Sequence, residues 1–313
     1  MKVVFQKFKK EVFIMVTLLT LIAGAELVSS VVNAQTLDTL VNMDIHNFFY
    51  KAICLVVIFA FYLLFTYMLI RYQAYFNQKV ATWLRDRISH SIEETSYGRF
   101  YEKNSQTYIS WFTSDLEQIK GNAINPTFEV IGGIISAVIS AVALFMYHWS
   151  IVLLAAICIV IMAVLPALFS AELTDKTIKV SEANEKFAKS ISDLLSGYDT
   201  LFVFRKLAYL RDKIHEKSVE VGDTHRDYSK TMAKVAVSGG IGNVFSQISV
   251  FILTGYLAYI GEVSIGSILA SMALSSTIFN VLGNISQKIG SIKSTNSLFK
   301  KYEQLEPASL VEE

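Results

Sequence analysis

VIGGIISAVISAVALFMYHWSIVLLAAICIVIMAVLPALFSA, residues 130–171, is a stretch without a single Asp, Glu, Lys or Arg. A helix needs roughly 20 apolar residues to cross the hydrocarbon core of a bilayer. The stretch is therefore long enough for two consecutive spans, which would turn at His148 and Trp149. This pair predicts a protein embedded in a membrane.

Apolar stretches of the same kind recur along the chain, and only one of them contains a charged residue, Glu26. The six predicted spans are residues 12–34, 52–70, 130–147, 150–171, 235–260 and 263–287. A hydrophobic content of 53% and a mean hydropathy of +0.43 exceed what the core of a soluble protein uses. We therefore predict an all-α membrane protein with six transmembrane helices.

The basic residues predict how the spans are oriented. Of the 28 Lys and Arg residues, 27 lie on one side of the six spans, and Lys51 is the exception. Basic residues near span ends mark the cytoplasmic face. Both termini are therefore expected in the cytoplasm, and we expect a multi-pass protein of a bacterial plasma membrane. The net charge of +1 gives no indication of nucleic-acid binding, and no metal-ligand spacing is found among the histidines and cysteines.

The N-terminus allows an alternative interpretation. Basic residues, an apolar run and then Val32, Asn33 and Ala34 resemble a secretory signal with its cleavage site. However, the apolar run is longer than the roughly 7–15 residues usual in such signals, and Glu26 interrupts it. Removing it would also leave an odd number of spans. An uncleaved first span is the favoured interpretation.

Two connections are long, residues 71–129 and 172–234, and the connections on the other side are short. The long ones show helical periodicity with interspersed charges and no cluster of proline or glycine. They predict long cytoplasmic helical extensions of the spans, with a tight reversal near the middle of each. Aromatic residues gather at both reversals; they either pack the tip of the bundle itself or form an exposed docking surface for a partner.

Three segments resemble the membrane domain of an ATP-binding cassette (ABC) exporter. They are the stretch from Phe100 to Asp115 and Leu116, the acid-x-x-x-Gly-x-acid-Thr pattern from Asp193 to Thr200, and residues 255–270 between the last two spans. Their order and spacing along the chain are those of the family. The resemblance covers residues 10 to 305.

The resemblance implies a mechanism and a set of partners. Two such membrane domains, identical or different, would pair, and two nucleotide-binding domains would drive transport on closing around ATP. Residues 107–116 and 196–205 resemble the two coupling helices that contact those domains. The residues that the resemblance assigns to coupling are Tyr108, Trp111, Phe112, Asp115, Gly197, Tyr198, Asp199, Thr200 and Phe204.

The chain departs from the family pattern at two positions. Gln106 stands where a glycine is usual, and Val281 stands where a proline is usual. No Gly-x-x-x-x-Gly-Lys-[Ser/Thr] loop occurs, so we expect residues 1–306 to be the membrane domain and residues 307–313 to begin a connector to a nucleotide-binding domain. No cofactor is expected in this chain; ATP and Mg would bind in that other domain, whether it is fused or a separate polypeptide.

Glu26 is the first candidate for the translocation path, because an acid within a span is costly and by default functional. The alternative is a structural role beside a polar neighbour or near the outer boundary. Ser267, Ser271 and Ser275 share one helical face and would either line the cavity or hold helices together. The substrate is not readable, and amphipathic or hydrophobic cargo such as a peptide, lipid or drug is expected.

Two other classes of protein share this topology. A secondary transporter should show charge networks or broken helices at the midplane, and only one acid is found there. A membrane sensor or adaptor could signal through the helical stalks, and it would bind a partner without ATP-driven flux. The ABC exporter is the favoured interpretation.

Overall fold

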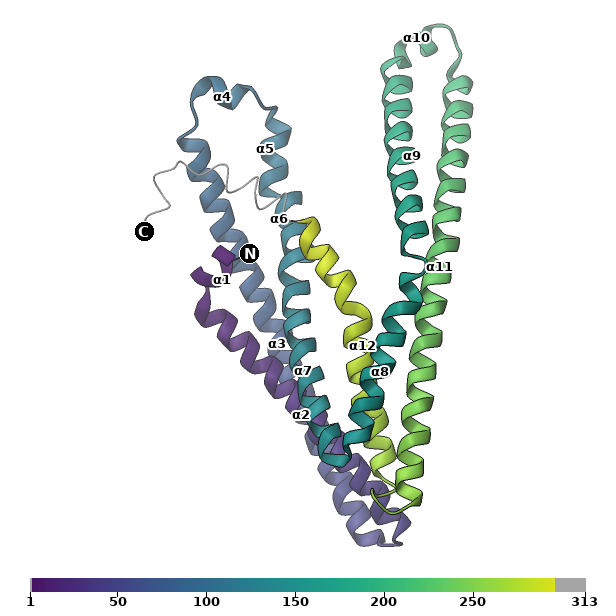
Figure 1. The fold of residues 1–313 in the computed structure, drawn as a ribbon. Coiled ribbons are helices and arrows are strands. Elements are labelled where there is room, and N and C mark those ends of the chain that lie inside the picture. Colours follow the sequence, from purple (N-terminus) through teal and green to yellow (C-terminus); the bar gives the residue numbers. More distant parts are fainter. Residues whose placement is uncertain (1, 296–313) are drawn as a thin grey trace. The chain divides into compact units, whose positions relative to one another are not determined.

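The structure is a computed structural model that describes residues 2–295, and every regular element in this range is a helix (Figure 1). The described chain divides into two compact units. Among the described residues, unit 1 comprises residues 2–155 and 249–295, and unit 2 comprises residues 156–248. The connector predicted at residues 307–313 lies outside the described residues.

Unit 1 contains the first helices of the described chain and its last helix. Its helices are α1 (Lys2–Lys7), α2 (Lys9–Val41), α3 (Ile45–Glu93), α4 (Tyr97–Tyr101), α5 (Ser105–Phe112), α6 (Ser114–Ile119), the π-helix η1 (Lys120–Ile124), α7 (Asn125–Tyr147) and α12 (Ser267–Ser294). Helix α2 packs against α3, and α12 packs against both α7 and α2. These four long helices form the body of the unit.

Unit 2 is a long helical hairpin. It contains most of α8 (Trp149–Ala167), then α9 (Ser170–Ser196), the short α10 (Tyr198–Val203) and most of α11 (Leu207–Tyr259). Helix α8 ends one residue after Pro166, inside the predicted span 150–171. A proline cannot donate the backbone hydrogen bond that continues a helix.

Six helices within residues 2–295 are long and apolar enough to cross a membrane, which confirms the predicted number of spans. The predicted helical extensions are also present. Helix α3 has 49 residues and α11 has 53, more than twice the length that a span needs. The extension before α7 differs from the prediction, because it is divided into α5, α6 and η1 rather than continuous.

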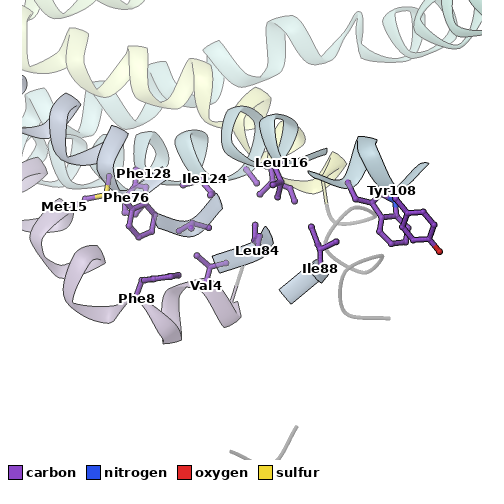
Figure 2. Close-up of a cluster of buried hydrophobic side chains, with 14 residues drawn as sticks. Val4, Phe8, Met15, Phe76, Leu84, Ile88, Tyr108, Leu116, Ile124 and Phe128 are labelled. Carbon is purple, nitrogen blue, oxygen red and sulfur yellow. The ribbon is translucent and has the colours of Figure 1, made fainter. Parts of the chain in front are cut away.

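A buried hydrophobic cluster holds unit 1 together beyond the predicted spans (Figure 2). Phe8 from the start of α2 lies edge-on to Phe76 of α3, and Phe76 lies edge-on to Phe128 of α7, at centroid distances of 6.0 and 5.4 Å. The cluster continues along α3 to Trp111 in α5. Burying apolar side chains is favourable where water surrounds a helix, whereas lipid gives no such driving force.

Within the spans, small residues allow close packing instead. A Cβ atom on Gly133 of α7 would lie 3.0 Å from a methyl carbon of Val281 in α12. In unit 2, a Cβ atom on Gly242 would lie 3.3 Å from Met162. Gly242 therefore serves close helix packing, as small residues commonly do in membranes.

Candidate coupling and translocation sites

The first candidate coupling region is the reversal between α3 and α7. Its predicted helix, residues 107–116, is interrupted at Thr113, whose φ of −123° and ψ of −89° separate α5 from α6. Tyr108 stacks on Phe100 with ring centroids 4.7 Å apart, and its hydroxyl donates a hydrogen bond to the Phe100 carbonyl at 3.1 Å. These contacts tie α5 to α4 across the turn.

Of the two alternatives for the aromatic residues, packing within the tip itself holds for part of this region. Tyr108 and Trp111 are 8% and 1% exposed, and Asp115 is buried with them on the same side of the segment. Phe112 is partly buried. The cause is the helical period, since residues at intervals of three and four share one face, and Tyr108 and Trp111 on that face join the buried cluster with residues of α3.

Different side chains face outward at this first tip. Tyr97 and Tyr101 of α4 are exposed, and their rings lie 4.7 Å apart. Ile109 of α5 is exposed as well. The sequence analysis missed Ile109 as a candidate contact residue, although its place on the helix face opposite Trp111 could have indicated that it is exposed.

The second candidate coupling region is α10 with its flanking turns, and here the aromatic residues are exposed, as the alternative of a docking surface requires. Tyr198, Phe202 and Phe204 are 44%, 59% and 71% exposed, and Tyr198 stacks on Phe202. The remaining predicted residues lie beside them: Asp199 and Thr200 are exposed, and Gly197 is partly buried. We call Tyr198, Phe202, Val203 and Phe204 the α10 patch. Four large apolar side chains held at a tip away from the spans are typical of an interaction site.

The turn after α10 has a defined geometry. The Lys206 amide donates to the Leu201 carbonyl at 2.8 Å, and the Arg205 amide donates to the Phe202 carbonyl at 3.0 Å. This pair of bonds is a Schellman motif, which requires a left-handed residue, and Arg205 adopts a φ of 55°. The α10 patch is therefore fixed on an ordered turn.

A polar contact joins the two long helices of unit 2. The Thr231 hydroxyl and the Lys234 ammonium both donate to Oε1 of Glu172 at 3.0 Å. The hydrogen bond from Lys234, and then that from Thr231, lowers the pKa of the Glu172 carboxyl below its ordinary value of 4.5. The pair connects α9 to α11 just beyond the predicted end of the fourth span.

The predicted path residues lie in unit 1, at separate places. Glu26 is partly buried in α2, and its side chain forms no ion pair among residues 2–295. Ser267, Ser271 and Ser275 are fully buried on one face of α12, where that helix packs on α2 and α7. The Ser271 and Ser275 hydroxyls have no hydrogen-bond partner in the described structure. In the single chain these serines thus lie between helices, and lining a path stays a prediction.

Sequence reasoning missed a groove between α7 and α12. It is about 230 Å³ in volume and is lined by Glu129, Gly133, Asn280, Asn284 and Lys288, among others. Asn280, Asn284 and Lys288 are spaced four residues apart on α12, and Lys288 pairs with Glu129 of α7. The signal was present in the sequence, because two carboxamides at that spacing inside an apolar span form a polar stripe.

No group of three or more His, Cys, Asp or Glu side chains that could hold a metal ion occurs in residues 2–295. Cys54 and Cys158 are free thiols. The described part of the chain thus offers candidate surfaces for protein contact and for cargo, and it offers no cluster for metal chemistry.

Comparison with known proteins identifies the family. A search of curated proteins returned no match. A family model described as the ABC transporter transmembrane region matches residues 12–282, which include all six candidate spans in whole or in part and both reversals. The match covers most of the chain and agrees with the six-helix architecture. The chain therefore belongs to the family of ABC transporter transmembrane regions.

Proposed function

We propose that this chain forms half of the translocation path of an ATP-driven exporter and couples to nucleotide-binding domains through its two tips. The α10 patch carries this proposal. It holds large apolar side chains away from both lipid and the protein interior, and such surfaces are usually covered by a partner. A membrane domain that receives motion from a separate ATPase domain requires a contact of this kind.

The two tips have different parts in this proposal. At the first tip, Tyr108 and Trp111 hold the reversal rigid, and Tyr97, Tyr101 and Ile109 make the outward contacts. At the second tip, the α10 patch itself would enter a cleft of the nucleotide-binding domain. We propose that both tips face the cytoplasm, where ATP and Mg would bind in that domain.

The path itself is assigned to the groove between α7 and α12. Exposed carboxamides are unfavourable against lipid, because hydrocarbon cannot satisfy their hydrogen bonds. Asn280 and Asn284 would therefore face a water-filled cavity between this chain and a second membrane domain. The cargo expected there is amphipathic, because polar amides and apolar spans line the groove together.

Coupling is tested with the nucleotide-binding domain encoded with this chain, in the same frame or separately. Phe202→Asp and Phe204→Asp should abolish its binding to the chain in nanodiscs and should uncouple ATP hydrolysis from transport. Ile178→Asp is the matched control, since Ile178 is similarly exposed on α9. Unchanged binding and coupling in both patch variants would contradict the proposal.

The path assignment has a separate test. In a background with Cys54 and Cys158 replaced by Ala, Asn284→Cys should react with a thiol reagent that dissolves only in water. Val138→Cys, exposed on the apolar α7, should not react. Equal protection of both positions would contradict a hydrated groove.

A further inference from the structure

A second groove lies where the N-terminal helices meet α3, on the predicted cytoplasmic side. It is about 390 Å³ in volume, and neither the coupling tips nor the translocation path use it. The N-terminal side supplies Lys7 and Phe8, and α3 supplies Tyr75, Lys79 and Trp83. Cationic and aromatic side chains thus meet in one concave surface.

The groove begins at the depth of lipid headgroups. Lys7 lies five residues before Val12, where the first span starts, and Tyr75 lies five residues after Ile70, where the second ends. Five residues correspond to about 7.5 Å along a helix axis. The headgroup region extends about 5–8 Å beyond the hydrocarbon on each side. Tyr75, which lies on the continuous helix α3, therefore stands beside the headgroups, and Lys7 lines the same groove.

The balance of charge favours an anion. The Lys7 ammonium has no ion-pair partner among residues 2–295, and Lys9 and Lys10 are exposed on the next turn. Lys79 pairs with Glu11, and it also lies over the ring of Tyr75 with Nζ 5.8 Å from the centroid. Of the residues that line the groove, one is an acid, the exposed Asp86. Asp86 lies eleven residues after Tyr75 on α3, so its charge is at the other end of the groove from Tyr75.

The floor of the groove is formed by packed aromatic side chains. Phe8 is 6% exposed and lies edge-on to Trp83 at 5.8 Å. The backbone of Phe8, with φ −110° and ψ 40°, ends α1 and starts α2, so the chain bends here. Lys7 and Phe8, on either side of this bend, both line the groove. Figure 2 shows Phe8 within the buried cluster beside α3.

We propose that this groove binds the phosphate headgroup of an anionic phospholipid. The Lys7 ammonium and the Tyr75 hydroxyl would donate to the phosphate, with Lys9 and Lys10 adding attraction, and the Phe8 and Trp83 rings would contact the glycerol end of the lipid. Basic pockets beside spans and interfacial aromatics both recognise lipids in this way. A lipid is favoured over a soluble anion because the groove opens beside the headgroups.

The test uses the purified full chain in a non-ionic detergent. Phosphatidylglycerol is titrated, and bound lipid is counted by native mass spectrometry while the melting temperature is followed. Phosphatidylcholine and inorganic phosphate are the comparison ligands. We expect phosphatidylglycerol alone to be retained and to raise the melting temperature.

Two variants change the charge of the groove in opposite directions. Lys7→Gln should weaken phosphatidylglycerol binding about fivefold, the effect of one basic residue near an anionic headgroup. Asp86→Asn should strengthen it. Lys51→Gln, a change at the opposite end of the spans, should leave binding unchanged.

Each result decides the proposal. Equal retention of phosphatidylcholine, or equal stabilisation by inorganic phosphate, would overturn a site for an anionic lipid. The same affinity in Lys7→Gln, Asp86→Asn and the native chain would overturn this groove as its location. Lys7 and Asp86 are both exposed and do not pack in the hydrophobic core, so the variants test lipid binding rather than folding.

Discussion

Replacing Gly266 by Ala should destabilise the chain through a single backbone contact. Gly266 precedes α12, and a Cβ atom there would lie 1.9 Å from the carbonyl oxygen of Ala34 in α2. Its φ of −61° suits any residue, so the effect is steric and not conformational. The Gly266 amide also donates to Oδ1 of Asp38 at 2.6 Å, which ties α12 to α2.

The size of the effect follows from this geometry. Carbon and oxygen atoms approach to about 3.3–3.6 Å even in close Cα–H···O contacts, so the two backbones must separate by about 1.4 Å or more. That movement would stretch the 2.6 Å hydrogen bond to about 4 Å and break it. A hydrogen bond to a charged group is worth about 1.5–3 kcal/mol, and overpacking costs about 1–3 kcal/mol. We expect a loss of about 3–5 kcal/mol in the free energy of unfolding.

The assay is equilibrium unfolding of the detergent-solubilised chain, followed by tryptophan fluorescence. Gly283→Ala in the same helix is the matched control, because a Cβ atom there meets nothing within 4 Å. It should be neutral or stabilising by up to about 1 kcal/mol. Asp38→Asn keeps the side-chain size and should cost less than Gly266→Ala. A Gly266→Ala variant as stable as Gly283→Ala would refute the close approach of α2 and α12.

Three further predictions concern the tips and the stalk. Trp111→Ala should lower the free energy of unfolding by about 3–5 kcal/mol, because it empties a fully buried site. Phe204→Ala should leave the stability of the single chain unchanged, because Phe204 is exposed. Thermal unfolding of the two variants distinguishes an aromatic residue that stabilises the fold from one that is available for docking. Arg205→Gly should stabilise the turn after α10 by about 1 kcal/mol, since glycine adopts a positive φ without strain, and slower hydrogen exchange of the Lys206 amide would show it. The pKa of Glu172 is lower in the folded chain, so its ion pair contributes stability above about pH 4.5 that is lost as the pH falls further. Glu172→Gln should therefore flatten the loss of melting temperature between about pH 5 and pH 3, and the exposed Glu185→Gln should keep the native slope.

Part of the candidate site could be predicted from local sequence alone. The α10 patch follows from aromatics placed beside a helix break, and the break itself is encoded by neighbouring residues. The first tip could not be predicted in the same way. Both faces of α5 carry large apolar residues, Trp111 on one and Ile109 on the other, so only contact with α3 decides which one is buried.

The sequence by itself determined the six spans, the long helical extensions and the family. These depend on length, charge and local backbone preference, which act within a few residues. Only the tertiary structure decided that Gly266 meets Ala34 and Asp38, and that Lys288 of α12 pairs with Glu129 of α7. The physical reason is that a span is apolar on every side, so hydrophobic periodicity does not mark its inward face. That face is selected by small residues and polar partners, which can lie more than two hundred residues apart in the chain.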